Sequence, residues 1–169
     1  MNYFNLTYHD VANGPGVRVV LGVSGCSIKC PGCHNPHAQD FCIGEKFDDY
    51  AMTKLKEGLR LSETRGLTVT GGHPLEHRNI FKVREILHEL NEEFPNKDIW
   101  LYTGLTLTDD DFIRDGYLSA TLKECDVVVD GPYLEEERDI TLAHRGSRNQ
   151  RLIDVKKTLE NKKITLLTL

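Results

Sequence analysis

Short apolar runs alternate with helix-like segments along most of this chain, and this alternation constrains the fold more than any other feature. The apolar runs are rich in β-branched residues and end at glycine or polar turns, as buried strands do, whereas the segments between them repeat apolar residues every three or four positions. The predicted strands are 17–23, 67–70, 99–102, 127–129 and 151–155, and the predicted helices are 47–59, 80–94 and about 108–123. Such alternation favours right-handed βαβ crossovers, and we expect an α/β fold.

The length limits how such a sheet can close. A closed eight-fold βα barrel takes about 250 residues, and this chain has 169. At about 30 residues per βα unit, it supplies about five units. We predict one domain over residues 1–169, built as a partial (βα) barrel or an open, mostly parallel sheet with helices outside. Ligands of such sheets bind at the carboxyl ends of the strands, so the loops there should share one pocket.

Charge and hydropathy exclude several classes of protein. The chain has 21 Lys and Arg against 26 Asp and Glu, a formal net charge of -5, which is the wrong sign for gripping phosphate backbones. We expect no direct nucleic acid binding. The first ten residues have no basic segment followed by an apolar one, and nowhere do 18 apolar residues run together. No membrane association is predicted, and the expected location is the cytoplasm.

Three of the five cysteines lie within eight positions, directly after the first predicted strand. Cys26, Cys30 and Cys33 have the spacing C-x3-C-x2-C, and Pro31-Gly32 should fold the loop back so that three thiolates converge on a metal centre. A [4Fe-4S] cluster usually takes four cysteines, so three would leave one iron open to a small molecule.

A structural zinc site is the alternative. Cys3His is a common tetrahedral zinc set, and either His34 or His37 would be the fourth ligand. The spacing alone leaves both metals open. The position favours iron and sulfur, because zinc usually stabilises small loop-rich units, whereas this loop follows a buried strand of a sheet that needs no metal to hold its core. A non-catalytic, zinc-stabilised binding domain is the competing hypothesis.

The cysteine spacing resembles the signature of radical S-adenosylmethionine (SAM) enzymes. Further segments resemble one branch of that superfamily, the activating proteins of anaerobic (class III) ribonucleoside-triphosphate reductase. These segments are Asn13–Arg18, Ser24–Cys26, Cys30–Cys33 with Asn35-Pro36, Leu67–Gly72, Lys97–Trp100 with Tyr102–Gly104, Val129–Gly131, and Arg145–Ser147 with Asn149–Arg151. Another radical SAM enzyme, either a pyruvate formate-lyase type activase or a deazapurine synthase, is the nearest alternative.

The resemblance implies the cofactors and the reaction. Cys26, Cys30 and Cys33 would hold one [4Fe-4S] cluster, whose fourth iron binds the amino and carboxylate groups of S-adenosyl-L-methionine. An electron from the cluster would break a carbon–sulfur bond of the sulfonium. The 5'-deoxyadenosyl radical formed would remove a hydrogen atom from the α-carbon of a glycine in the large subunit of the reductase. The positions that align with SAM contacts are Gly32, Cys33, His34 and Gly72.

Two histidines depart from the family pattern. His34 stands where the family usually has a tyrosine, and His73 stands where it usually has an acidic residue. The preceding pair Gly71-Gly72 should expose backbone N–H and C=O groups for close contact with a charged amino-acid moiety, unless it is only a strand-to-helix turn. A histidine at position 73 is tolerable if recognition uses this main chain, but it has the wrong charge if a carboxylate must pair with the substrate amine.

The remaining features are less specific. Cys42 and Cys125 alone cannot bind a second four-cysteine cluster. We expect both to be packing residues, because they are isolated thiols with apolar sequence neighbours or at a strand edge. The low-potential electron should therefore come from an external donor such as a flavodoxin or ferredoxin. The basic segment 145–151 is either a solvated loop or a docking surface for the reductase. The tail 156–169 is either a last strand or a frayed end.

Overall fold

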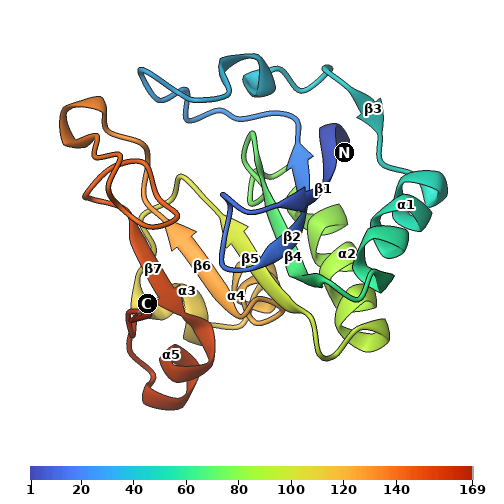
Figure 1. The fold of residues 1–169 in the computed structure, drawn as a ribbon. Coiled ribbons are helices and arrows are strands. Elements are labelled where there is room, and N and C mark those ends of the chain that lie inside the picture. Colours follow the sequence, from blue (N-terminus) through green and yellow to red (C-terminus); the bar gives the residue numbers. More distant parts are fainter. Residues whose placement is uncertain (169) are drawn as a thin grey trace.

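A seven-stranded sheet with the strand order β3-β1-β2-β4-β5-β6-β7 organises the chain (Figure 1). The computed structural model describes residues 1–168. The strands are β1 (Asn2–Asp10), β2 (Val17–Val23), β3 (Glu45–Lys46), β4 (Thr64–Gly71), β5 (Asp98–Tyr102), β6 (Val127–Asp130) and β7 (Arg151–Asp154). The helices are α1 (Asp49–Arg60), α2 (Ile80–Glu93), α3 (Asp109–Ile113), α4 (Tyr117–Leu122) and α5 (Val155–Asn161), with 3-10 turns η1 (Pro36–Gln39) and η2 (Glu135–Glu137). In this described part, none of the helices has the length and apolar character needed to cross a membrane.

The four central strands, β2, β4, β5 and β6, are parallel, and the outer strands pair antiparallel with them or with each other. Within residues 1–168 the sheet stays open, with β3 at one edge and β7 at the other. Each connection between two parallel neighbours contains at least one helix, as parallel crossovers require. The predicted α/β fold with an open, mostly parallel sheet and surrounding helices is therefore confirmed.

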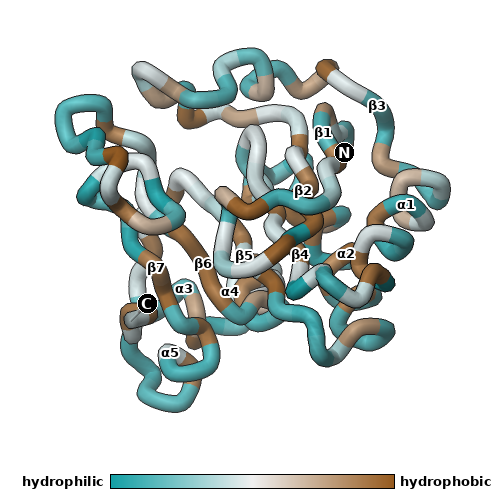
Figure 2. The backbone as a smooth tube through the Cα atoms, in the orientation of Figure 1, coloured by the Kyte–Doolittle hydropathy of each residue, from teal (hydrophilic) through white to brown (hydrophobic). Residues whose placement is uncertain are grey.

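One face of the sheet packs against the helices. Helix α1 begins after Asp48, whose side chain accepts a hydrogen bond from the Ala51 N–H at 3.0 Å. Its apolar residues recur at every fourth position and are buried, and each large one contributes about 1.5–3 kcal/mol to stability. Figure 2 shows the apolar residues concentrated on the strands in the interior. The sheet contributes Val19, Leu21, Val23, Leu67, Val69, Ile99, Leu101, Val128 and Ile153 to this core.

The opposite face of the sheet holds a buried charge, Arg18 on β2. Its guanidinium donates hydrogen bonds to the Thr68 hydroxyl and the Leu67 carbonyl, both at 2.7 Å. It also lies 2.5 Å from the Asp98 carboxylate and 5.5 Å from the centre of the Trp100 ring. A buried charge is tolerated only when it is paired and hydrogen bonded. We call Arg18 and Trp100 the floor, because the next residues on this face of the sheet line the cavity described below.

Two elements differ from the sequence prediction. The sequence pattern does not predict β1, because polar residues interrupt its apolar alternation. In the structure, the pairing of β1 with β2 is also irregular at two places. The helix predicted over 108–123 is instead two helices, α3 and α4. It starts as expected at Thr108, whose N–H and hydroxyl each donate to the Asp111 carboxylate at 2.8 Å. The break falls at Asp115-Gly116, a turn-forming pair in which Gly116 is extended.

The end of the chain extends the β7 edge of the sheet. Strand β7, the predicted fifth strand, pairs antiparallel with β6. Beyond α5, the Leu167 N–H donates to the Leu152 carbonyl at 2.8 Å, and the Asp154 N–H donates to the Thr165 carbonyl at 2.9 Å. The tail therefore pairs with the sheet as far as it is described, and Leu169 lies outside the described residues.

Candidate metal and cofactor site

Four loops meet at the carboxyl ends of the parallel strands. Figure 1 shows the long loops after β2 (blue) and β6 (orange) at the same end of the sheet. Together with the loops after β4 and β5, they line a cavity of about 1030 Å³. The lining includes Gly32 and Cys33 after β2, Gly72 after β4, Thr103 after β5 and Gly131 after β6. The predicted shared pocket is present because parallel strands end at one edge of the sheet.

The cysteine loop is held at its start and folds back on itself. The Cys26 N–H donates to the Gln39 carbonyl at 3.1 Å, which ties the outgoing chain to the returning turn η1. The Cys33 N–H donates to the Cys30 carbonyl at 3.2 Å. Between them, Gly32 has a φ of 70°, a left-handed conformation that favours glycine. The local sequence thus produces the predicted reversal between the second and third cysteines.

The three thiols of this loop are partly accessible and lie close enough to influence one another. Cys33 lines the cavity. Burial raises the pKa of the Cys30 thiol, a hydrogen bond from the Tyr133 main chain opposes this, and the negative charges of Cys26 and Cys33 raise it further. Neighbouring thiolates repel one another, so a bound cationic centre would be needed to keep all three ionised at neutral pH.

The donor set fits an iron–sulfur cluster better than a single ion. Across residues 1–168, no three His, Cys, Asp or Glu side chains are placed to hold one metal ion. Tetrahedral zinc requires such convergence, whereas the thiolates of a cluster bind different irons. The ring of His37 instead packs edge-on against Phe4 at 5.3 Å, and His34 is exposed at the cavity. The described residues therefore contain no preassembled Cys3His site.

The glycine turn after β4 fits tightly against the cysteine loop. The N–H groups of Gly72 and His73 donate to the carbonyls of Val23 and Gly25 at 2.7 and 2.9 Å. These donors are consequently not available to a ligand, in contrast to our expectation that both N–H and C=O groups are exposed. No group within residues 1–168 donates to the Gly72 carbonyl. A Cβ atom on Gly72 would lie 2.6 Å from the Gly25 carbonyl oxygen, so only glycine fits here.

His73 is turned away from the cavity. Its side chain is buried, with Nε2 2.8 Å from the Thr103 hydroxyl and Nδ1 3.8 Å from the Glu76 carboxylate. Burial lowers the pKa of His73, and the nearby Glu76 only partly opposes this, so the imidazole is neutral at neutral pH. The departure at position 73 therefore places no positive charge in the cavity.

The loop after β6 closes on the cysteine loop. Tyr133, Glu135 and Arg145 line the cavity. Arg145 belongs to the basic segment 145–151, but the sequence pattern assigns none of the three as a site residue. A Cβ atom on Gly32 would lie 3.0 Å from the Glu135 carboxyl group and 3.2 Å from the Tyr133 ring. The turn residues after the fourth predicted strand indicate a loop at the pocket, but they carry no signal for which side chains face it.

Comparison with known proteins identifies the family. Residues 12–153 match the family described as a 4Fe-4S single cluster domain. Proteins named anaerobic ribonucleoside-triphosphate reductase-activating protein, from Pasteurella multocida, Vibrio cholerae and Enterobacteria phage T4, are 36%, 38% and 39% identical to it over 152 residues each. The alignments cover 89%, 89% and 90% of this chain and 95%, 96% and 93% of those relatives. This chain belongs to the anaerobic ribonucleoside-triphosphate reductase-activating protein family.

The family assignment confirms the resemblance seen in the sequence. The matched 4Fe-4S domain runs from the turn before β2 to β7, so it includes the cysteine loop and all four parallel strands. The three clustered cysteines and the glycine turn lie inside the matched region, as do the residues that line the cavity apart from Phe4 and Asn5.

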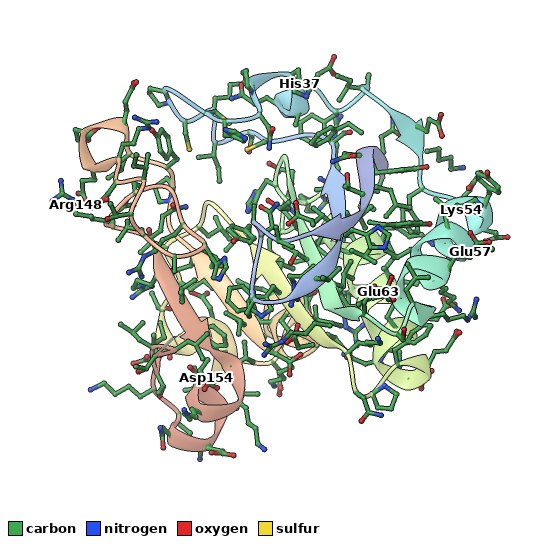
Figure 3. All side chains as sticks on the ribbon, in the orientation of Figure 1. His37, Lys54, Glu57, Glu63, Arg148 and Asp154 are labelled. Atoms are coloured by element: carbon green, nitrogen blue, oxygen red, sulfur yellow. The ribbon has the colours of Figure 1, made fainter. Side chains whose placement is uncertain are left out.

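The side chains of the basic segment 145–151 mostly form hydrogen bonds within the fold. Arg151 Nε donates to the Asp130 carboxylate at 3.0 Å, and Arg145 Nη1 donates to the Gln150 carbonyl at 3.4 Å. Arg148 is exposed, and Figure 3 shows it at the outer edge of the loop, pointing away from the sheet. Of the three arginines, Arg148 is thus the one best placed to contact a partner.

The two cysteines outside the loop have different environments. Cys125 is buried, as expected for a packing residue, and burial raises its pKa far above the usual value. The expectation for Cys42 is wrong, because its side chain is exposed. Cys42 lies in an irregular segment where its N–H donates to the Asp40 carboxylate at 2.9 Å, so its apolar sequence neighbours do not cover it.

Proposed function

We propose that this activating protein binds one [4Fe-4S] cluster through Cys26, Cys30 and Cys33 and uses S-adenosyl-L-methionine to generate a glycyl radical on anaerobic ribonucleoside-triphosphate reductase. The observation that carries the proposal is that Cys33 of the cysteine loop and Gly72 of the glycine turn line one cavity. Relatives matched over nearly their whole length are named as activators of this reductase. When bound, the two cofactors supply one-electron cleavage of the sulfonium and a 5'-deoxyadenosyl radical that removes hydrogen from glycine.

The part of the chain in this reaction is to bind and orient SAM beside Cys33. The Gly72 carbonyl, which accepts no hydrogen bond from residues 1–168, is a suitable acceptor for the amino group of SAM. Gly32 leaves room at the cavity because it has no side chain, and the exposed ring of His34 offers a flat surface for the adenine. Recognition at the glycine turn then uses the main chain, which makes a neutral His73 acceptable.

The size of the cavity supports a small-molecule site. Such sites usually measure about 300–1,000 Å³, and this cavity measures about 1030 Å³. SAM would bind there, and the segment of the reductase that carries the reacting glycine would approach it. The buried floor of Arg18 and Trp100 lies on the same face of the sheet as the strand residues that line the cavity, which would exclude water on that side.

The electron for the cluster would come from a separate protein. Cys42 is exposed and Cys125 is buried on the helix side of the sheet, so they do not form a second site in the described residues. A one-cluster protein without a further redox group needs an external low-potential donor. We propose a flavodoxin or a ferredoxin in this role.

The test compares two cysteine variants after anaerobic reconstitution with iron and sulfide. Cys30→Ala removes a proposed ligand, whereas Cys42→Ala removes an exposed cysteine outside the loop. We expect the parent and Cys42→Ala to bind iron and to form 5'-deoxyadenosine from SAM after reduction, and Cys30→Ala to form none. With the large reductase subunit added, electron paramagnetic resonance should detect a glycyl radical for the first two proteins only.

The outcomes separate the alternatives. Product formation by Cys30→Ala at the parent rate would reject Cys30 as a ligand. Formation of 5'-deoxyadenosine without a glycyl radical on a competent reductase would point to another radical SAM reaction. A colourless protein with one tightly bound zinc ion would reject the proposal as a whole.

A further inference from the structure

A carboxylate that does not line the cavity contacts the cysteine loop from behind. Glu76 lies in the connection between β4 and α2, and its Oε2 accepts hydrogen bonds from the Ser27 N–H at 3.0 Å and the Ser27 hydroxyl at 2.5 Å. Ser27 directly follows Cys26. The side chain of Glu76 is 17% exposed, so water screens its charge only weakly.

Other hydrogen bonds already hold the start of the cysteine loop, and the contact between Glu76 and Ser27 is added to them. The His73 N–H donates to the Gly25 carbonyl at 2.9 Å, and the Cys26 N–H donates to the Gln39 carbonyl at 3.1 Å. The buried Asn79 side chain donates to the Ser24 carbonyl at 2.9 Å. Since neutral groups already fix the path of the chain, the distinctive contribution of Glu76 is its negative charge.

That charge has no cation to neutralise it among the described residues. Burial favours the neutral acid, but hydrogen bonds from Ser27 and from the His77 main chain outweigh this and hold the pKa of Glu76 below its usual value. The nearest basic group is His73 at 3.8 Å, which is neutral because burial lowers its pKa. Within residues 1–168, no Lys or Arg forms an ion pair with Glu76. A negative charge therefore lies against Ser27, the residue that directly follows the first cysteine of the loop.

The charge acts on any redox centre held by the neighbouring cysteines. The reduction potential of an iron–sulfur cluster depends on net charge, hydrogen bonds to sulfur and solvent exposure. A fixed negative charge opposes the addition of an electron, and it does so more strongly in a poorly solvated place. The Ser27 hydroxyl, a possible donor to sulfur, is directed at Glu76 instead. Both effects lower the potential.

We infer that Glu76 is a positioning residue that fixes Ser27 and lowers the reduction potential of the cluster bound at Cys26, Cys30 and Cys33. The inference rests on the proposed function, because it requires a cluster at these cysteines. A lower potential makes the reduced cluster a stronger electron donor to the sulfonium of SAM. The acidic residue that the family usually has at position 73 is absent here, and Glu76 supplies a carboxylate behind the loop rather than in the cavity.

The experiment measures the cluster potential by a redox titration followed by electron paramagnetic resonance. Glu76→Gln keeps an oxygen that can accept from Ser27 but removes the charge. The matched control is Glu85→Gln, which removes the same charge from the exposed face of α2, where Glu85 pairs with Lys82 at 2.6 Å. We expect Glu76→Gln to bind as much iron as the parent, with a more positive potential. The expected shift is about tenfold in the reduction equilibrium, or about 59 mV for one electron. Glu85→Gln should titrate with the parent, and Glu76→Asp, which keeps the charge, should return toward it.

Each result supports or overturns the inference. A potential of Glu76→Gln equal to that of the parent overturns it, as does an equal shift in Glu85→Gln. If Glu76→Gln does not retain iron, Glu76→Asp decides the question. It keeps the charge behind the loop, so its potential should match that of the parent, and a rise overturns the inference. A parent protein that binds no cluster would instead reject the proposed function.

Discussion

Gly72→Ala should uncouple the glycine turn from the cysteine loop. The added methyl group would lie 2.6 Å from the Gly25 carbonyl oxygen and 2.7 Å from the Ala38 carbonyl oxygen. Both contacts are to backbone, which cannot rotate away as a long side chain can. The start of the cysteine loop must therefore move away from β4.

The loss of stability follows from the hydrogen bonds that these two carbonyl oxygens accept. The Gly25 carbonyl accepts from the His73 N–H at 2.9 Å, and the Ala38 carbonyl accepts from the Gly25 N–H at 2.8 Å. Overpacking costs about 1–3 kcal/mol, and weakening two such hydrogen bonds costs about 0.5–1.5 kcal/mol each. We expect the free energy of unfolding to fall by about 2–6 kcal/mol. Iron binding should fall as well, because Gly25 precedes Cys26.

Urea unfolding followed by circular dichroism under anaerobic conditions measures the first effect, and iron content after reconstitution measures the second. Gly116→Ala is the matched control, because a Cβ atom on Gly116 meets nothing within 4 Å and its backbone is extended. We expect the control to change stability by less than about 0.5 kcal/mol. A Gly72→Ala variant with the stability and iron content of the parent would refute the reasoning.

Two further predictions concern buried groups. Arg18→Leu leaves the Asp98 carboxylate without its buried partner and should cost about 3–5 kcal/mol. Arg65→Leu, which removes the exposed partner of the same Asp98, should cost less than about 1 kcal/mol; equal losses in urea unfolding would contradict this. Burial lowers the pKa of His73, so the imidazole binds a proton more readily in the unfolded protein than in the folded one. The contribution of neutral His73 to stability is therefore complete above about pH 6.5 and is lost as the pH falls. Unfolding measured between about pH 7.5 and 5 should lose up to about 1.4 kcal/mol per pH unit through this group, and His73→Gln should flatten the profile; an unchanged profile would reject the role of His73.

The sequence predicts best what is encoded locally. The strand before the cysteines, the reversal at Gly32 and the start of α3 at Thr108 each depend on a few consecutive residues, and the structure has all three. The break at Gly116 is also local, but the apolar spacing on either side of it favours a continuous helix. Cys42 shows the opposite limit, because in an irregular segment the sequence neighbours of a residue do not determine whether it is buried.

The sequence does not predict contacts between residues that lie far apart in the chain. Arg18 is separated from Thr68 by 50 residues and from Asp98 by 80, so a single sequence gives no sign that they form one network. His73 left two interpretations open, and the choice between them depends on Thr103, 30 residues further along the chain. The loop after β6 reaches the cysteine loop only through the fold of the whole sheet.

The single tryptophan of the chain lies in the floor, beside the Arg18 guanidinium. The ring of His144 packs edge-on against it at 5.5 Å, and Tyr102 on the same strand lines the cavity. Its fluorescence therefore originates from one known place, without background from other indoles. Because its neighbour His144 also lines the cavity, a change in emission as the cavity fills would report occupancy without an added label.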